Sequence, residues 1–158
     1  MKIALDAMGG DFAPSEIVRG ACLAAEELDV EVILVGDRHA IESELSKAGL
    51  RDLPLSIVHA GQVIPMDESH PVDAVRRMRS SSILVACDLV AQGDADAVVS
   101  AGNTGATMIS AIMRLKRLDG ADRPAICTVF PTTKGYSLLI DGGANSECRP
   151  HHMLSFAL

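Results

Sequence analysis

Short runs of apolar residues alternate along the chain with longer segments in which apolar positions recur every three or four residues. The short runs, which are typical of buried strands, are residues 2–7, 31–36, 55–59, 95–100, 124–130 and 137–141. The segments between them have the spacing of helices that bury one face. This alternation predicts an α/β fold, a three-layer doubly wound arrangement around a mostly parallel sheet.

Capping residues place several of the expected helix ends. Pro14 suits the first position of the first helix, and Asp37 is placed to cap a helix over residues 40–48 that Gly49 ends. Residues 60–71 carry two prolines and little periodicity, so we expect a loop there.

Serines interrupt the next helical segment, which begins near Val72. The run at residues 80–82 predicts a break and then a new helix over residues 82–92, closed by Gly93. A further helix is expected from residues 102–105 to about residue 118.

Glycine and small polar residues follow four of the expected strands, at residues 6–11, 36–37, 101–105 and 141–145. Ligands bind at this end of the strands in open α/β sheets. Glycine lets backbone N–H groups approach an anion, and a following helix adds free donors. Phosphate is therefore the simplest ligand, although a tight turn with a structural Asn103 explains the Gly-x-x-G pattern at least as well.

The densest basic cluster is Arg76, Arg77 and Arg79, and the serine run follows it directly. The arginine fork matches phosphate geometry. A solvated charged face paired with nearby acidic residues, Asp67, Glu68 and Asp73, is the structural alternative. Helical spacing puts Arg76 and Arg79 on similar faces and Arg77 on another, so the three cannot all serve one ligand.

Three carboxylates, Asp6, Asp11 and Asp141, lie in or beside the glycine loops. They suit proton positioning or metal binding, but capping explains Asp11 and loop hydrogen bonds explain Asp6 equally well. The histidines show no metal-ligand spacing, and we expect no metal site. The sequence lacks a Gly-x-Ser-x-Gly elbow, a Walker loop and a G-x-G-x-x-G fingerprint, which disfavours serine hydrolases, P-loop enzymes and standard dinucleotide enzymes.

Composition narrows the function classes further. The 158 residues carry a net charge of -7 and only 3% aromatic residues, which argues against a nucleic-acid binder. The four cysteines are far apart and without C-x-x-C spacing, so we expect reduced thiols. No signal-peptide core or membrane-spanning run is present in the sequence, and we expect a cytoplasmic protein.

Five sequence blocks together resemble the PlsX family of bacterial phosphate acyltransferases. They are LDAMGGD at residues 5–11, AVRR at 74–77 with SSS at 80–82, SAGNTGA at 100–106, DRPA at 122–125 and DGGAN at 141–145. The resemblance implies reversible transfer of a fatty acyl group from acyl carrier protein to inorganic phosphate, which gives acyl phosphate for phospholipid synthesis. It implies no cofactor, a homodimer, and a downstream glycerol-3-phosphate acyltransferase as a further partner.

The resemblance also implies a fold like that of isocitrate and isopropylmalate dehydrogenases and phosphotransacetylases, with peripheral contact at the membrane. Family members are considerably longer, and the amphipathic helix expected over residues 151–158 ends without a C-cap. Residues 1–158 are therefore expected to be the N-terminal portion of a single, apparently truncated α/β domain.

Phosphate dianion is already nucleophilic, so the expected site holds and orients it rather than forming a covalent intermediate. Cys148 has no histidine base beside it in sequence, which disfavours an acyl-enzyme at this thiol. The residues expected to be catalytic are Asp6, Asp11, Asn103 and Asn145. Those expected to bind substrate are Gly9, Gly10, Arg76, Ser81, Ser82, Gly102, Thr104, Gly105 and Gly143.

Two other functions remain open at this point. One is a dehydrogenase-like or sugar-phosphate-binding enzyme on the same architecture, because fold alone does not fix function. The other is a non-catalytic fragment that needs a partner chain.

Overall fold

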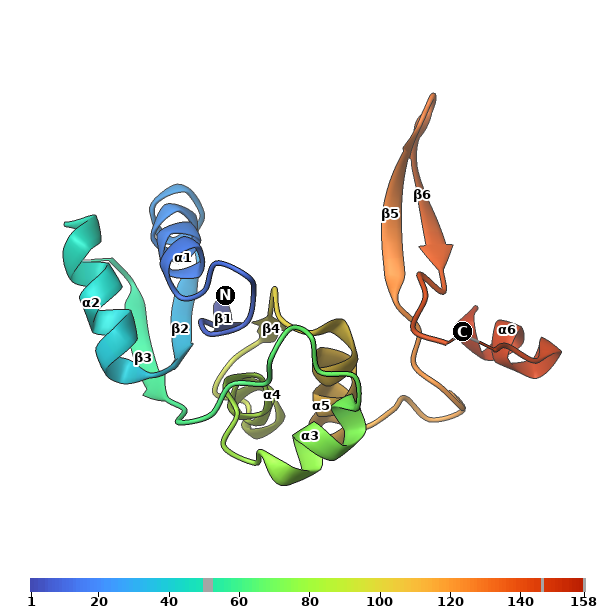
Figure 1. Cartoon of the computed structure of the whole chain (residues 1–158). Coiled ribbons are helices and arrows are strands. Elements are labelled where there is room, and N and C mark those ends of the chain that lie inside the picture. Colours follow the sequence, from blue (N-terminus) through green and yellow to red (C-terminus); the bar gives the residue numbers. More distant parts are fainter. Residues whose placement is uncertain (50–52, 146, 158) are drawn as a thin grey trace. The chain divides into compact units, whose positions relative to one another are not determined.

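Four parallel strands form a sheet in the order β3-β2-β1-β4 (Figure 1). They are β1 (Lys2–Asp6), β2 (Glu31–Gly36), β3 (Leu55–His59) and β4 (Ala97–Val99). The structure is a computed structural model that describes residues 1–49, 53–145 and 147–157. It contains two compact units, Met1–Leu115 and Lys116–Leu158, and the sheet belongs to the first.

The register of the sheet brings the ends of β1 and β4 together. Leu5 pairs with Leu34 of β2 on one side and with Val99 of β4 on the other. Because these strands are parallel, Asp6 and Ser100 follow the paired residues at the same edge of the sheet. The loops after β1 and β4 therefore start at neighbouring points.

Helices cover both faces of this sheet, which confirms the expected three layers (Figure 1). The helices of the first unit are α1 (Ser15–Glu27), α2 (Arg38–Ala48), α3 (Pro71–Arg77), α4 (Ser82–Gln92) and α5 (Thr104–Leu115). Val32 and Leu34 share one core with residues of α1 and α2. Ile33 and Val35 share another with residues of α4. Successive residues of β2 thus point to opposite faces, as the pleat requires.

A third core joins α3, α4 and α5. Val75, Leu84, Cys87 and Ala106 are at most 1% exposed and contact one another in this cluster, together with Ile64 from the loop before α3. The helices on this side of the sheet therefore form a packed group of their own, with α4 between the sheet and the other two.

Several predicted helix ends are confirmed. Oδ1 of Asp37 accepts a hydrogen bond from the N–H of Ala40 at 2.8 Å, which caps α2. Gly49 and Gly93 have φ values of 68° and 82° and end α2 and α4 in the left-handed conformation that glycine adopts readily. The bounds of β3 and α4 are those that the sequence predicts.

Other predicted boundaries were wrong by a few residues. Pro14 is the N-cap of α1 rather than its first residue, because its carbonyl accepts the hydrogen bond from Val18 while Ser15 begins the helix. Helix α5 ends at Leu115 because Lys116 has a φ of 68°, which stops the helix before residue 118. Strand β4 is shorter than expected, since the N–H of Ala95 bonds to Leu89 at the end of α4.

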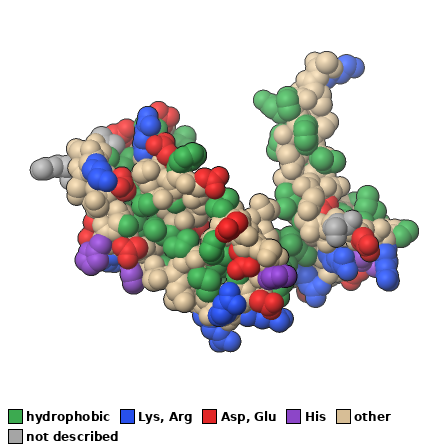
Figure 2. Space-filling view, in the orientation of Figure 1, with side chains coloured by type: hydrophobic (Ala, Val, Ile, Leu, Met, Phe, Trp, Pro, Cys, Tyr) green, Lys and Arg blue, Asp and Glu red, His purple; other side chains and the backbone are tan. Residues whose placement is uncertain are grey.

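The second unit contains a hairpin of β5 (Cys127–Thr132) and β6 (Gly135–Ile140), followed by α6 (Pro150–Phe156). The strands are antiparallel and form a separate two-stranded sheet, so they do not extend the parallel sheet. The reason is the connection: parallel neighbours need a crossover of about a dozen residues or more, and residues 133–134 are too few. Figure 2 shows hydrophobic side chains along the hairpin.

Helix α6 begins at Pro150, one residue before the expected C-terminal helix, whose last residue, Leu158, is outside the described residues. Within the part of the chain that the structure describes, no helix has the length and apolar character needed to cross a membrane.

Candidate functional site

Two glycine turns cross closely at the carboxyl ends of β1 and β4. A Cβ added to Gly9 would lie 3.0 Å from the Cα of Gly102, and a Cβ added to Gly102 would lie 3.2 Å from the Cα of Gly9. The Asp6 carboxylate, the Ser100 hydroxyl and the facing backbone occupy the space that side chains at these positions would need, so both positions favour glycine. The turns that the sequence places 93 residues apart are therefore one local structure.

The carboxylate of Asp6 accepts hydrogen bonds that hold this crossing in place. Asp6 is 2% exposed, its Oδ2 accepts a hydrogen bond from the Ser100 hydroxyl at 2.8 Å, and its Oδ1 accepts one from the N–H of Met8 at 3.2 Å. The Ser100 hydroxyl in turn accepts a hydrogen bond from the N–H of Gly102 at 3.0 Å. This chain of bonds connects the end of β1 to the turn after β4 and fixes the shape of both.

The turn after β4 leads directly into α5, and Asn103 caps that helix. Oδ1 of Asn103 accepts a hydrogen bond from the N–H of Ala106 at 2.9 Å. Its Nδ2 donates to the carbonyl oxygens of Met66 and Glu68 at 2.9 and 3.1 Å. Both donors of the side-chain amide are thus engaged, so Asn103 acts here as a cap and as a tether for the loop before α3.

The first turn of α5 offers free backbone donors. Among the described residues, the N–H groups of Asn103, Thr104 and Gly105 have no hydrogen-bond acceptor. Free N–H groups and the positive end of the helix dipole together make a site that suits an anion. The helix start that the sequence predicts at residues 102–105 is present, and phosphate binding there stays a prediction.

The remaining residues of the first loop lie near this crossing or on the surface. Gly10 has a φ of 125°, and a Cβ added there would meet the carbonyl oxygen of Ala101 at 3.4 Å. Asp11 is exposed, and it does not cap α1, because Pro14 holds the N-cap position. The capping explanation for Asp11 was therefore wrong.

The arginine and serine cluster is divided between the surface and the interior. Arg76 and Arg79 are exposed, and neither has an acidic partner among the described residues. Arg77 has an ion pair with Glu68 at 3.9 Å. Among the described residues, it is the one ion pair between this arginine cluster and the nearby acidic residues that were expected to neutralise it.

The serines that precede α4 are buried. Ser81 and Ser82 are 0% and 1% exposed, and Ser81 holds the N-cap position without a side-chain hydrogen bond. The Ser81 hydroxyl has no hydrogen-bond partner within the described residues. Because α4 leads back to the start of the parallel strand β4, its first turn lies at the carboxyl end of the sheet, as the glycine turns do.

In the second unit, Asp141 gathers the loop after β6. Its carboxylate accepts hydrogen bonds from the N–H groups of Ile126, Ala144 and Asn145 at 2.7, 3.2 and 2.7 Å. Burial alone would raise the pKa of Asp141, but the hydrogen bonds from Ile126, Asn145 and Ala144 outweigh it and lower the pKa below the usual value.

The two other predicted residues of this loop have different surroundings. Nδ2 of Asn145 donates to Asp141 and to the carbonyl of Pro124, both at 3.0 Å, so its amide donors are engaged. Gly143 has a φ of 102° with open space at its Cβ position. Both residues belong to the second unit, and their place in the site remains a prediction.

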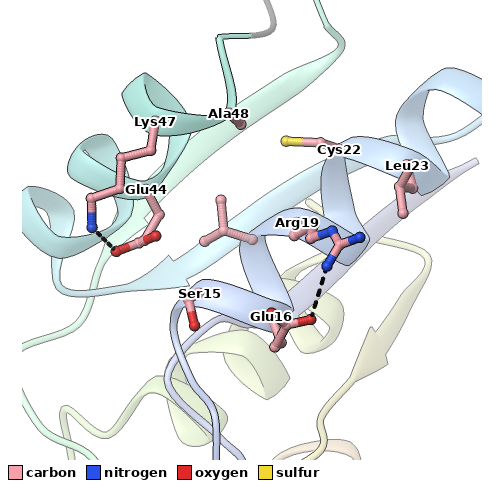
Figure 3. A pocket seen from close by; sticks show the side chains of 9 residues that line it. Ser15, Glu16, Arg19, Cys22, Leu23, Glu44, Lys47 and Ala48 are labelled. Atoms are coloured by element: carbon pink, nitrogen blue, oxygen red, sulfur yellow. Dashed lines mark hydrogen bonds and ion pairs between the residues drawn. The ribbon is translucent and has the colours of Figure 1, made fainter.

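A separate hollow of about 410 Å³ lies between α1 and α2 (Figure 3). Its charged side chains pair with one another, Arg19 with Glu16 at 3.7 Å and Lys47 with Glu44 at 2.7 Å. Burial, with a smaller contribution from Glu26, raises the pKa of the Cys22 thiol in this hollow. None of the predicted site residues lines it.

Two residues of the site were missing from the sequence-based selection. Ser100 lies in the strand-to-turn segment next to the predicted residues, but its bond to Asp6 depends on which strands are neighbours. Gln62 contacts the turn at residues 80–82, called the serine turn below, and lies in a segment that the sequence marks only as a loop. Neither residue had a local sequence signal.

Comparison with known proteins gives consistent matches. The sequence matches the family described as "Fatty acid synthesis protein" over residues 1–158. It is 56% identical to a phosphate acyltransferase of Desulforamulus reducens over 158 residues, which cover 100% of this chain and 47% of that protein. It is 52% identical to a phosphate acyltransferase of Pelotomaculum thermopropionicum, with 100% and 46% covered. The chain thus spans about half the length of the curated relatives it matches.

The fold also occurs in a solved structure. The EutD phosphotransacetylase from Staphylococcus aureus superposes with a TM-score of 0.69 over 99% of this chain and 50% of that chain. The sequence identity is 22%, so this likeness concerns the fold. It confirms the expected resemblance to the phosphotransacetylase fold.

Proposed function

The chain belongs to the fatty acid synthesis protein family, and we propose that the whole protein reversibly transfers a fatty acyl group from acyl carrier protein to inorganic phosphate. The relatives of about 50% identity named phosphate acyltransferase support this reaction. The observation that carries the proposal is the anion site itself, where the crossing of Gly9 and Gly102 leads into the free N–H groups of α5.

In the proposed reaction, a phosphate oxygen attacks the carbonyl carbon of the acyl thioester. The new C–O bond forms, the C–S bond breaks, and the proton of hydrogen phosphate ends on the departing thiolate. The products are acyl phosphate and the carrier thiol. No covalent bond to the protein is needed, since phosphate is itself the nucleophile.

The main task of the protein is then to orient phosphate against the thioester. Orientation of this kind contributes about 7–11 kcal/mol in favourable cases, and one donor aimed at the developing oxyanion contributes about 3 kcal/mol. The N–H groups of Gly9, Gly10, Thr104 and Gly105 supply donors in our proposal, while Gly102 allows the backbone to approach closely. Asn103 positions the start of α5.

The arginine and serine cluster completes the phosphate site in this proposal. Arg76 supplies positive charge, as an exposed guanidinium without an acidic partner among the described residues. Ser81 and Ser82 contribute through the first turn of α4, because their side chains are buried. Gly143 and Asn145, in the loop after β6, remain predicted site residues.

The carboxylates have a supporting role in the proposal. Asp6 carries negative charge beneath the turns and would repel phosphate in direct contact, so it orients the loop through Ser100 and Met8. Asp11 is exposed at the same loop and is placed to handle the proton that leaves phosphate. We further propose that the protein is a homodimer and that a glycerol-3-phosphate acyltransferase consumes its product.

The reaction is tested with the whole protein, acyl carrier protein loaded with a fatty acyl group, and inorganic phosphate. Acyl phosphate should form only when phosphate is present. Adding a nicotinamide cofactor to the assay should cause no change in its absorbance. Absence of acyl phosphate would overturn the proposal.

The phosphate site is tested by charge reversal. Arg76→Glu should raise the phosphate KM by about tenfold or more, because a charge-assisted contact is replaced by repulsion. Arg19→Glu makes the same change at an exposed arginine of α1 and should leave the phosphate KM unchanged. Equal effects of the two variants would remove Arg76 from the site.

A further inference from the structure

One loop contacts the first turns of both helices that the proposed phosphate site uses. It runs from the end of β3 to the start of α3, and its side chains Ala60 and Ile64 are 2% and 6% exposed. At its far end, Pro71 lies so near Gly105 of α5 that an added Cβ would come within 2.8 Å of the proline ring. The loop is therefore held against the fold at both ends.

Near the start of this loop, Gln62 makes four hydrogen bonds with the serine turn before α4. Its backbone N–H donates to the carbonyl of Ser80 at 3.3 Å, and its carbonyl accepts from the N–H of Ser82 at 3.0 Å. Its side-chain Oε1 accepts from both the N–H and the hydroxyl of Ser80, at 3.2 and 2.7 Å. One side-chain oxygen thus holds two donors of the turn.

Near its other end, the same loop is tethered to α5. Nδ2 of Asn103 donates to the carbonyls of Met66 and Glu68, while Oδ1 of Asn103 caps α5. The segment between residues 62 and 68 therefore connects the start of α4 to the start of α5. It is attached at one end by the backbone and side chain of Gln62 and at the other by the side chain of Asn103.

We propose that Gln62 is a positioning residue that sets the spacing between the N-termini of α4 and α5, and through it the geometry of the phosphate site. This inference rests on the proposed function. Gln62 does not touch phosphate in this arrangement; it acts through Ser80. Loss of its side-chain oxygen leaves the donors of Ser80 to water, since that residue is exposed, and removes two of the four hydrogen bonds that fix the position of the turn.

Positioning of this kind affects rate and binding more than folding, because reacting groups lose much of their advantage when displaced by about 1 Å. The two backbone hydrogen bonds between Gln62 and the serine turn do not depend on the side chain. A variant at this position therefore keeps the connection of loop and turn, and the protein is expected to fold.

The test compares three variants of the whole protein. Gln62→Ala removes the Oε1 acceptor, and Ser80→Ala removes the hydroxyl that donates to this oxygen at 2.7 Å. Gln92→Ala removes an exposed glutamine side chain at the opposite end of α4 and serves as the control. The phosphate KM, the carrier KM and kcat are measured in the acyl phosphate assay.

Gln62→Ala should raise the phosphate KM about fivefold to tenfold, because the turn loses its two hydrogen bonds to Oε1, while the carrier KM stays unchanged. Ser80→Ala should raise the phosphate KM in the same direction but by less, because it removes one of the two hydrogen bonds to Oε1, and Gln92→Ala should not change it. If Gln62 had only a structural role, Gln62→Ala would lower the stability of the protein and would affect the phosphate KM and the carrier KM alike. An unchanged phosphate KM in Gln62→Ala would overturn the inference.

Titration calorimetry with inorganic phosphate separates this inference from the proposed function. If the unaltered protein makes no acyl phosphate, the proposed function fails. Weaker phosphate binding by Gln62→Ala than by the unaltered protein would still support the positioning role. Equal binding by the two proteins, or no binding by either, would contradict it.

Discussion

The hydroxyl of Ser100 donates a hydrogen bond to the buried carboxylate of Asp6 at 2.8 Å, although 94 residues separate the two in sequence. The bond exists because β1 and β4 are parallel neighbours whose carboxyl ends coincide. It connects the two glycine turns on which the proposed phosphate site depends.

Removing this hydroxyl should destabilise the first unit. Ser100→Ala leaves an acceptor of the buried Asp6 carboxylate without its partner, which costs about 1–3 kcal/mol in the free energy of unfolding. Urea denaturation of the 158-residue chain measures the change. Ser46→Ala, which removes an exposed hydroxyl bonded to the carbonyl of Glu42, is the control and should cost less than about 0.5 kcal/mol. Equal losses in the two variants would contradict the importance of the Asp6 contact.

The crossing of the turns should tolerate no side chain. Gly9→Ala places a Cβ against the Asp6 carboxylate and 3.0 Å from the Cα of Gly102, so the carboxylate or the turns must shift, and we expect acyl phosphate formation by the whole protein to fall at least about tenfold. Gly20→Ala adds the same methyl group to α1, where no atom lies within 4 Å of its Cβ position. That variant should keep full activity and gain up to about 1 kcal/mol of stability. Full activity in Gly9→Ala would show that the crossing is not part of the site.

The four thiols should react in two classes. Cys22 and Cys87 are buried, whereas Cys127 and Cys148 are exposed. A thiol reagent at neutral pH should therefore modify two cysteines rapidly in the folded chain and all four in denaturant. Rapid modification of Cys87 in the folded chain would contradict the packing of α4 against α5.

Alkaline pH should destabilise the core between α3, α4 and α5, which contains Cys87. Burial, followed by the nearby Asp88 and Asp6 charges, raises the pKa of the Cys87 thiol from 9.0 to about 11. The stability that comes from the neutral thiol is fully present below pH 9.0 and is lost as pH rises through about 11. Cys87→Ala removes this titration, so the slope of unfolding free energy against pH in this range should decrease. An unchanged slope would indicate that Cys87 does not contribute to it.

Acid should open the loop of the second unit. Hydrogen bonds lower the pKa of Asp141 below 3.8, so its stabilising contribution is present above that pH and is lost as pH falls through the lowered pKa. Amide protection of Ala144 and Asn145 should decrease over that range, while protection in the hairpin at Val129 should depend less on it. Asp141→Ala should remove the protection of both loop amides at neutral pH. Retained protection would contradict the role of the carboxylate.

The sequence predicted the central sheet well because its signals are local. Buried strands appear as continuous apolar runs, and capping residues such as Asp37 and Gly93 mark helix ends through their own backbone preferences. The antiparallel hairpin was within reach of the same reasoning, since the short connection between Phe130 and Ser137 leaves no room for a crossover. The apolar pattern of its strands gave no sign of their direction.

The candidate site was predicted less completely, because contacts between distant segments decide it. The turn at residues 102–105 was recognised as a helix start that can bind an anion, and α5 begins there. The engagement of the Asn103 amide by Met66 and Glu68 depends on where the preceding loop passes, which no local pattern indicates. The same holds for the burial of Ser81.

The pairing of β1 with β4 has a consequence for biosynthesis. The first turn is complete after about ten residues have been made, but its partner turn is not available until residue 102 has left the ribosome. Closing so large a chain segment is slow compared with forming local helices. Until then the Asp6 carboxylate stays hydrated, and the proposed phosphate site forms only when both glycine turns are present.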